Sequence, residues 1–220
     1  MIDPKVRQRR GRSGNASDFR RVFVIRVHQL LELGYRKLTS LAWSTAGETA
    51  ITGEIVRAMD EVLENPPQYW FRHFSVHDDP PVNAPGHLGR SRKRLDIKIV
   101  SSQYLPRSKF SFEAKRLGKH NPVSGYVGSD GLQCFLRGDY AAAEDDAGML
   151  GYVQWDTAEN WASKIQAKFE ESYNDFALYD NSTWRKYPMR SGPTYTYHTR
   201  HNRVSLGRPI DIYHTLLMFC

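Results

Sequence analysis

Alternating apolar and polar residues mark two short strands near the middle of the chain. In residues 94–100 every second side chain is Leu or Ile, and in residues 109–115 every second side chain is Phe or Ala. A period of two is the signature of a half-buried strand. The segment between them, SSQYLPRS (101–108), is short enough for a hairpin. We therefore predict two adjacent antiparallel strands.

Helices and further strands are predicted on both sides of this hairpin. Before it we expect helices over 19–35 and 44–64, the second capped by Ser44 or Thr45, and an aromatic strand over 68–77. After it we expect a short helix over 138–148, a buried strand over 149–155, a helix over 156–173, and strands over 193–203 and 209–220. This order of elements predicts an α/β fold, with a mixed sheet flanked by helices.

The composition is that of an ordinary folded chain. Of its 220 residues, 40% are hydrophobic and 25% are charged, which is typical of a globular protein. Residues 1–17 are rich in Arg, Gly and Ser, so we expect a flexible basic arm followed by one domain over 18–220. No run is apolar enough for a membrane helix, no secretory signal is recognisable, and two cysteines make no disulfide framework. These features favour a cytoplasmic protein without membrane contact.

Charge is distributed unevenly along the chain. Lys and Arg number 31 against 24 Asp and Glu, and residues 1–40 alone account for the net charge of +7. Residues 90–119 hold ten Lys or Arg and only two acids, whereas residues 130–180 hold eleven acids and three bases. Basic zones of this kind favour a polyanionic partner. A solvated surface of mixed charge is the alternative.

Two acids and a lysine stand on the polar faces of the predicted hairpin. Asp96 lies on its first strand, and Glu113 and Lys115 lie two residues apart on its second. On adjacent antiparallel strands the polar faces coincide, so these side chains are expected to converge. Two carboxylates are hard oxygen ligands for Mg²⁺ or Mn²⁺, and a lysine beside them can orient water or stabilise charge on a phosphate. The group predicts a metal-dependent phosphodiesterase.

This pattern resembles the PD-(D/E)xK, or restriction-endonuclease-like, nuclease superfamily over about residues 44–173. Asp96 matches the Asp of one central strand, and Glu113-x-Lys115 matches the motif of the next, while Leu95 stands where the family usually has Pro. The resemblance implies an αβββαβ core and endonucleolytic cleavage of DNA with Mg²⁺ or Mn²⁺. It also implies a setting in phage defence or a mobile element. The basic N-terminal helical extension and the last strands would be additions to that core.

The same family carries a further acidic ligand on the helix before the motif strands. In the helix predicted over 44–64, Glu48 lies at the edge of the apolar side and Glu54 lies on the polar side. We therefore expect Glu48 to complete a metal site with Asp96 and Glu113. The alternative is that Glu48 only stabilises the first helical turn.

Several basic residues are expected to contact nucleic acid. They are Arg94, Lys98, Arg116 and Lys119 around the motif, His198 and Arg200 on a C-terminal strand, and Arg9 and Arg10 in the arm. Two points stay open, because Lys98 could share the role of Lys115, and His198 with Arg200 could be plain strand surface.

No module for base readout is visible in the sequence. Target recognition is therefore expected from a partner protein or from DNA structure, and a homo-oligomer is also open. Two other functions fit the same residues. One is an RNase that uses the same site, and the other is a non-catalytic nucleic-acid-binding or assembly subunit that retains the nuclease fold.

Overall fold

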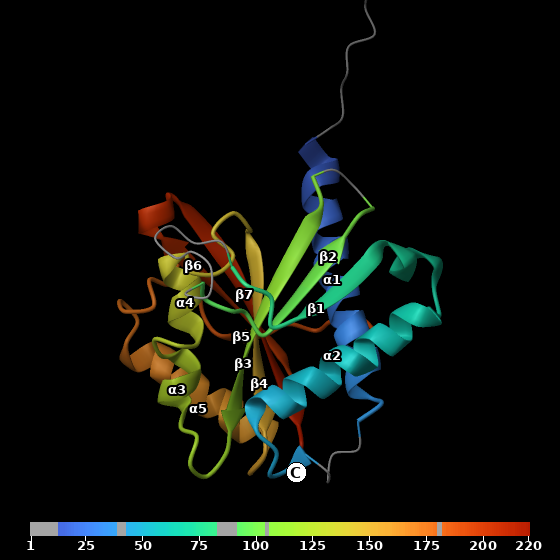
Figure 1. The fold of residues 1–220 in the computed structure, drawn as a ribbon. Helices are drawn as coiled ribbons and strands as arrows, with labels where there is room; N and C mark the ends of the chain where they lie inside the picture. The colour runs from blue at the N-terminus through green and yellow to red at the C-terminus, as the bar shows by residue number, and fades with distance from the viewer. Residues whose placement is uncertain (1–12, 39–42, 83–91, 104–105, 180–181) are drawn as a thin grey trace, which may run out of the picture.

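Seven strands form one mixed sheet in the computed structural model, and helices lie on both of its faces (Figure 1). The structure describes residues 13–38, 43–82, 92–103, 106–179 and 182–220. In these residues the strands lie side by side in the order β1 (Phe74–Asp78), β2 (Ile97–Ser101), β3 (Ser108–Leu117), β4 (Asp146–Val153), β7 (Arg208–Met218), β6 (Thr196–Arg203) and β5 (Arg185–Lys186). This arrangement confirms the α/β class and the mixed sheet predicted from the sequence.

The predicted hairpin is present as β2 and β3. The two strands are antiparallel, with Ile97 opposite Phe112 and Ile99 opposite Phe110. β3 then pairs in parallel with β4, and β4 pairs in parallel with β7. The outer pairs β1–β2, β6–β7 and β5–β6 are antiparallel, which makes the sheet mixed.

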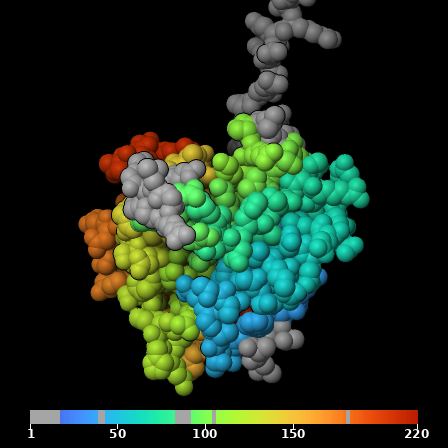
Figure 2. Space-filling view, viewed as in Figure 1, coloured from blue at the N-terminus to red at the C-terminus, as the bar shows by residue number. Residues whose placement is uncertain are grey.

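Helices α1 (Ser13–Tyr35) and α2 (Glu48–Glu64) cover one face of the sheet, and α3 (Val123–Val127), α4 (Leu132–Arg137) and α5 (Ala158–Glu171) cover the other (Figure 1). In the same view, Figure 2 shows α2 in cyan and the region of α3 and α4 in yellow-green meeting over the central strands. Because side chains alternate along a strand, each face has its own apolar core. Phe110 and Phe112 belong to the core under α1 and α2, and Met149 belongs to the core under α3 to α5.

Gly34 determines how closely α1 and α2 pack. A Cβ atom at this position would lie 2.6 Å from Met59 Cγ and 3.1 Å from the backbone nitrogen of Met59. Only glycine therefore permits this approach of the two helices without a shift of backbone. The close contact holds α2, and with it Glu48 at its first turn, against the sheet.

The predicted helix over 138–148 is wrong. α4 ends at Arg137 because Gly138 adopts a left-handed conformation with φ of 80°, and turns follow up to β4. The buried guanidinium of Arg203 donates to the carbonyl oxygens of Ala141 and Glu144, at 2.7 Å each. Ala141 O accepts one turn hydrogen bond from Glu144 N at 3.2 Å, but both carbonyls are also bound by a side chain from β6, and tertiary contacts override the helix propensity of the alanines.

Three predicted boundaries also differ from the structure. Tyr69–His73 forms a short 3-10 helix, η2, in which Trp70 stacks on the buried Phe71, and only β1 remains of the strand predicted over 68–77. α2 begins at Glu48 after Gly47, so neither Ser44 nor Thr45 caps it. α1 begins at Ser13, inside the range expected for the arm, and residues 1–12 lie outside the described residues.

The C-terminal strands agree with the prediction, apart from small shifts at their ends. β6 and β7 are joined through a second 3-10 helix, η4 (Val204–Leu206), and β5 is an additional two-residue strand at the sheet edge. No helix in the described parts of the chain is long and apolar enough to cross a membrane.

Candidate active site

β2 and β3 separate beyond the residue pair Ile97–Phe112, and this fork builds the candidate site. β4 remains paired with β3 as far as Leu117, but among the described residues no strand pairs with the opposite edge of β3 after Phe112. The backbone N–H groups on that edge need other acceptors. Ala114 N donates to Asp96 Oδ2 at 2.7 Å, and Arg116 N donates to Glu48 Oε2 at 3.0 Å.

Lys115 joins the acids around this edge. Its Nζ donates to Glu113 Oε1 at 2.8 Å and to Glu48 Oε1 at 3.2 Å. The side chains of Lys115 and Glu113 are 18% and 7% exposed, so both pairs are largely shielded from water. Four side chains from α2, from the residue before β2, and from β3 therefore meet at one place. We call Glu48, Asp96, Glu113 and Lys115 the fork cluster.

The fork cluster contains more negative than positive charge, and its pKa values reflect this. Burial, reinforced by the neighbouring Asp96, raises the pKa of Glu113 to about 8, although Lys115 opposes the change. Burial also raises the pKa of Asp96, against the hydrogen bond from Ala114. For Lys115, burial lowers the pKa, but Glu113, Glu48 and Asp96 together raise it above its ordinary value. The lysine therefore remains an ammonium ion.

The donor set of the fork cluster fits a divalent cation that keeps water ligands. Asp96 and Glu113 are neighbouring carboxylates whose repulsion a cation would relieve, and Mg²⁺ is commonly held by one or two carboxylates plus water and phosphate oxygens. In the described part of the chain, no three His, Cys, Asp or Glu side chains form a group that could hold a metal by themselves. Asp96 and Glu113 are the two carboxylates of the fork cluster that could hold such an ion. Glu48 binds Lys115 and the backbone of Arg116 instead.

The structure distinguishes Glu48 from Glu54, and Lys115 from Lys98, which were the alternatives in the sequence. Glu48 lies beside Lys115, whereas Glu54 pairs with Arg57 at 2.8 Å on the outer side of α2, as the helical phase predicts. Lys98 lies opposite Ser111 and His77 within the sheet. Among the described residues Lys98 forms no ion pair. Lys115 is therefore the lysine that contacts the acids of the fork cluster.

The predicted nucleic-acid contacts are scattered over the molecule. Arg116 follows Lys115 on β3, and Lys119 lies just beyond the strand with its ammonium 5.8 Å from the centre of the Trp155 ring. Arg94 precedes Asp96 and pairs with the exposed Asp79. Arg9 and Arg10 lie outside the described residues.

His198 and Arg200 lie on the opposite face of the sheet from Lys115. Lys115 alternates with Ala114, whose side chain belongs to the core under α1 and α2, so Lys115 faces the α3–α5 side. His198 instead contacts the ring of Tyr213, which belongs to the core under α1 and α2. The structure therefore does not bring this pair to the fork cluster.

A second charged cluster was missed in the sequence. Arg20 of α1 donates to Asp146 Oδ1 at 2.8 Å and to Asp211 Oδ2 at 2.7 Å, and His198 Nε2 lies 2.8 Å from Asp211 Oδ1. We call Arg20, Asp146, His198 and Asp211 the Arg20 cluster. Its signal was an acid inside an apolar strand, because Asp211 lies between two isoleucines of β7.

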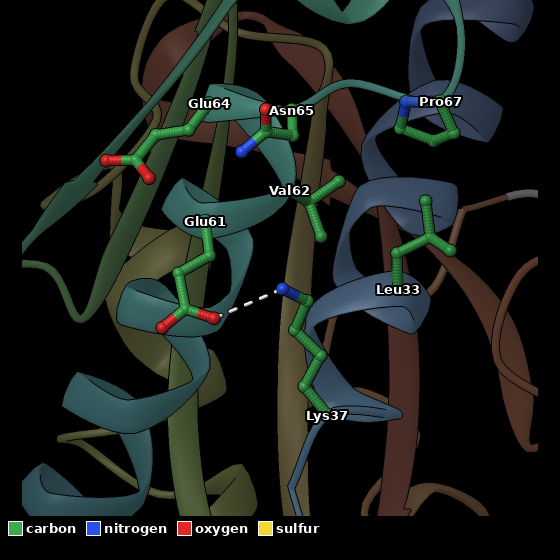
Figure 3. A pocket seen from close by; sticks show the side chains of 7 residues that line it. All are labelled: Leu33, Lys37, Glu61, Val62, Glu64, Asn65 and Pro67. Atoms are coloured by element: carbon green, nitrogen blue, oxygen red, sulfur yellow. Dashed lines mark hydrogen bonds and ion pairs between the residues drawn. The ribbon is translucent and has the colours of Figure 1, made fainter.

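A cavity of about 550 Å³ lies away from both clusters, between α1 and the C-terminal end of α2. In Figure 3, Leu33, Val62 and Pro67 point into the space between the two helices, and Lys37 pairs with Glu61 across it at 3.1 Å. Glu64 and Asn65 also line the cavity, and among the described residues its acids belong to no group that could hold a metal ion. We therefore place no chemistry in this cavity.

Comparison with protein-family models, with curated proteins and with solved structures gives no match to this chain. Function is therefore inferred from the side chains of the fork cluster and from their surroundings.

Proposed function

We propose that this protein is an endonuclease that hydrolyses DNA phosphodiester bonds with Mg²⁺ or Mn²⁺. The observation that carries the proposal is the meeting of Glu48, Asp96, Glu113 and Lys115 at the fork of β2 and β3. Carboxylates that lack counter-charge, next to a protonated lysine, are suited to metal-assisted attack on a phosphate. The element order α2, β1, β2, β3, α3–α4 and β4 supports a restriction-endonuclease-like αβββαβ core.

In this proposal each member of the fork cluster has its own task. Asp96 and Glu113 hold the metal ion, which when bound supplies a Lewis acid that activates water and neutralises phosphate charge. Lys115 donates from Nζ to the attacking water or to a phosphate oxygen, and so stabilises the negative charge that grows in the transition state. Glu48 positions Lys115 and remains the candidate for a third metal ligand.

The substrate is proposed from the charge around the site. Arg116 and Lys119 extend from the same strand end as Lys115 and would contact the phosphates on either side of the cleaved bond. A cytoplasmic setting in phage defence or a mobile element, with a partner protein or a homo-oligomer for target recognition, is proposed from the resemblance to the superfamily alone.

The test is a cleavage assay with a matched pair of variants on α2. Supercoiled DNA is incubated with the protein in Mg²⁺, in Mn²⁺ and in EDTA, and nicked and linear products are measured. We expect cleavage with either metal and none in EDTA. Glu48→Gln should lose at least about tenfold in rate, because it releases Lys115, and Glu54→Gln should cleave like the wild type.

Three further measurements separate the competing functions. RNA of the same sequence is offered as substrate, and cleavage of RNA alone would replace the DNA assignment by an RNase. Calorimetric titration with Mn²⁺ is compared between the wild type and Asp96→Asn, and the variant should bind more weakly. Metal binding without cleavage of DNA or RNA would instead identify a non-catalytic subunit, and absence of metal binding would reject the proposed site.

A further inference from the structure

A cavity of about 340 Å³ opens beside β6, on the side of the sheet away from Lys115. The residues that line it are Tyr179, Ser182, Thr183, Arg185, His198, Arg200 and Asp211. A neighbouring cavity of about 280 Å³ shares Arg185, His198 and Asp211 and extends to Arg20. These volumes are at the lower end of the range for small-molecule sites.

The wall of this cavity contains two buried polar atoms that have no hydrogen-bond partner among the described residues. His198 is 6% exposed, and its Nδ1 has no hydrogen-bond partner among the described residues, while its Nε2 is held by Asp211. Arg200 Nε is also buried without a hydrogen-bond partner there, and it lies 4.0 Å from Asp211 Oδ1. Arg200 Nε is a buried donor without an acceptor, which costs free energy, so an acceptor oxygen of a ligand would satisfy it. His198 Nδ1, in a neutral ring whose Nε2–H donates to Asp211, is an acceptor and would receive a hydrogen bond from a ligand hydroxyl.

The charges of the cavity also favour an anion. Among the described residues, the one acid that lines the 340 Å³ cavity is Asp211, and it is already engaged by Arg20 at 2.7 Å and by His198 at 2.8 Å. Arg185 is exposed and forms no ion pair within the described part of the chain. The guanidinium of Arg200 lies 4.7 Å from the centre of the Tyr179 ring, which holds it at the cavity wall. Two guanidinium groups therefore line a space in which the only carboxylate of the described lining is already engaged.

We propose that this cavity binds a small phosphate-bearing anion at a site separate from the fork cluster. Arg185 and Arg200 supply planar donor pairs that match phosphate oxygens. Ser182 Oγ accepts a hydrogen bond from the backbone nitrogen of Arg200 at 3.0 Å, which leaves its own proton free to donate to the ligand. The ring of Tyr179 lies at the rim for an organic group attached to the phosphate.

The experiment is calorimetric titration of the full chain with inorganic phosphate and, separately, with adenosine monophosphate. We expect one saturable site per chain for at least one of these two probes. Arg185→Ala should weaken binding by about 10- to 100-fold, because a charge-assisted hydrogen bond is lost. The matched control is Arg190→Ala, which removes an equal charge from an exposed residue that lines neither cavity, and it should bind within about twofold of the wild type.

Further variants make the proposal falsifiable without relying on one side chain. Arg200→Lys keeps the charge but loses the planar donor pair, so it should also weaken binding. Glu113→Gln should bind phosphate like the wild type, whatever happens to its nuclease activity, because the fork cluster lies across the sheet.

Four outcomes would overturn the proposal. The first is absence of saturable binding to either probe, and the second is an equal loss of affinity in Arg190→Ala and Arg185→Ala. The third is a loss of affinity in Glu113→Gln that Arg185→Ala does not show. The fourth is binding of a DNA oligonucleotide that depends on Arg185 when neither small probe binds. The last result would assign the cavity to backbone phosphates of DNA instead of to a small anion.

Discussion

Two charged clusters lie on opposite faces of the same sheet, and their charge balance differs. The fork cluster places three carboxylates around one ammonium, and the pKa of Glu113 rises to about 8, chiefly through burial and then through Asp96. The Arg20 cluster shares one guanidinium between two carboxylates and adds His198 to one of them. Although burial alone would raise the pKa of Asp211, its partners His198, Arg20 and Arg200 hold that pKa below its ordinary value.

This difference in charge supports the fork cluster as the proposed active site. A buried group of like charges without enough counter-charge is unstable until a cation or a proton joins it, and such groups are typical of active sites. In the Arg20 cluster the guanidinium opposes the effect of burial on the pKa values of both Asp146 and Asp211, and it also ties elements together. Arg20 connects α1 to the first residue of β4 and to β7. Similar residue types therefore connect elements on one face of the sheet and form the proposed active site on the other.

The largest expected effect tests the proposed activity of the fork cluster. Lys115→Ala removes the one ammonium of the fork cluster, so metal-dependent DNA cleavage should fall by about 10²–10³-fold. Lys109→Ala, at an exposed lysine of the same strand, should cleave at the wild-type rate. Initial rates on plasmid DNA decide between them, with circular dichroism as the check of folding. Wild-type rates for Lys115→Ala together with loss in Lys98→Ala would move the lysine role to Lys98.

A smaller effect tests the contribution of the Arg20 cluster to the stability of the fold. Arg20→Ala leaves Asp146 and Asp211 buried without their shared cation, which is strongly destabilising. Because the Arg20 side chain is 36% exposed and solvent screens its charge, we expect a loss of about 2–3 kcal/mol in the free energy of unfolding. Urea denaturation at pH 7 measures it. Arg57→Ala, at an exposed arginine with two ion pairs on α2, should change stability far less, and equal losses would show that burial does not distinguish the two arginines.

The smallest effect is a pH dependence of the metal-free protein. Glu113 binds its proton more tightly in the folded state than in the unfolded state, so its stabilising contribution is complete below pH 4.5 and is lost as the pH rises through about 8. Between pH 5 and pH 8 we expect the free energy of unfolding of the wild type to fall by roughly 2 kcal/mol relative to Glu113→Gln. This is less than the full pKa shift of Glu113 implies, because Asp96 titrates together with it. Urea unfolding in EDTA measures the difference in free energy of unfolding between the two proteins. A constant difference across this pH range would contradict a raised pKa of Glu113.

Local patterns predicted the hairpin and much of the fork cluster. The alternation of Ile97, Ile99, Phe110 and Phe112 with polar residues fixed both the strands and their buried face, because the period of a strand is a local property. The helical phase likewise placed Glu48 toward the sheet. The pattern did not reveal that Asp96 lies just before β2 and accepts a hydrogen bond from the open edge of β3.

The remaining features depend on contacts between distant parts of the chain. Arg20 is 126 residues from Asp146 and 191 residues from Asp211, and they meet only because β7 lies between β4 and β6. The helix expected over 138–148 failed for a related reason, since Arg203 of β6 binds two carbonyls of that segment. Strand order is not encoded in local periodicity, so neither result could be read from the sequence.

The open edge of β3 also determines how the fork cluster can be mutated safely. Asp96 and Glu48 occupy the two N–H groups that a neighbouring strand would otherwise bind. Asparagine and glutamine keep a carbonyl oxygen in the same place, whereas alanine at both positions would expose a bare strand edge, which is a template for association with another chain. Alanine variants at these positions should therefore be recovered as aggregates, and loss of activity in them would report insolubility instead of chemistry.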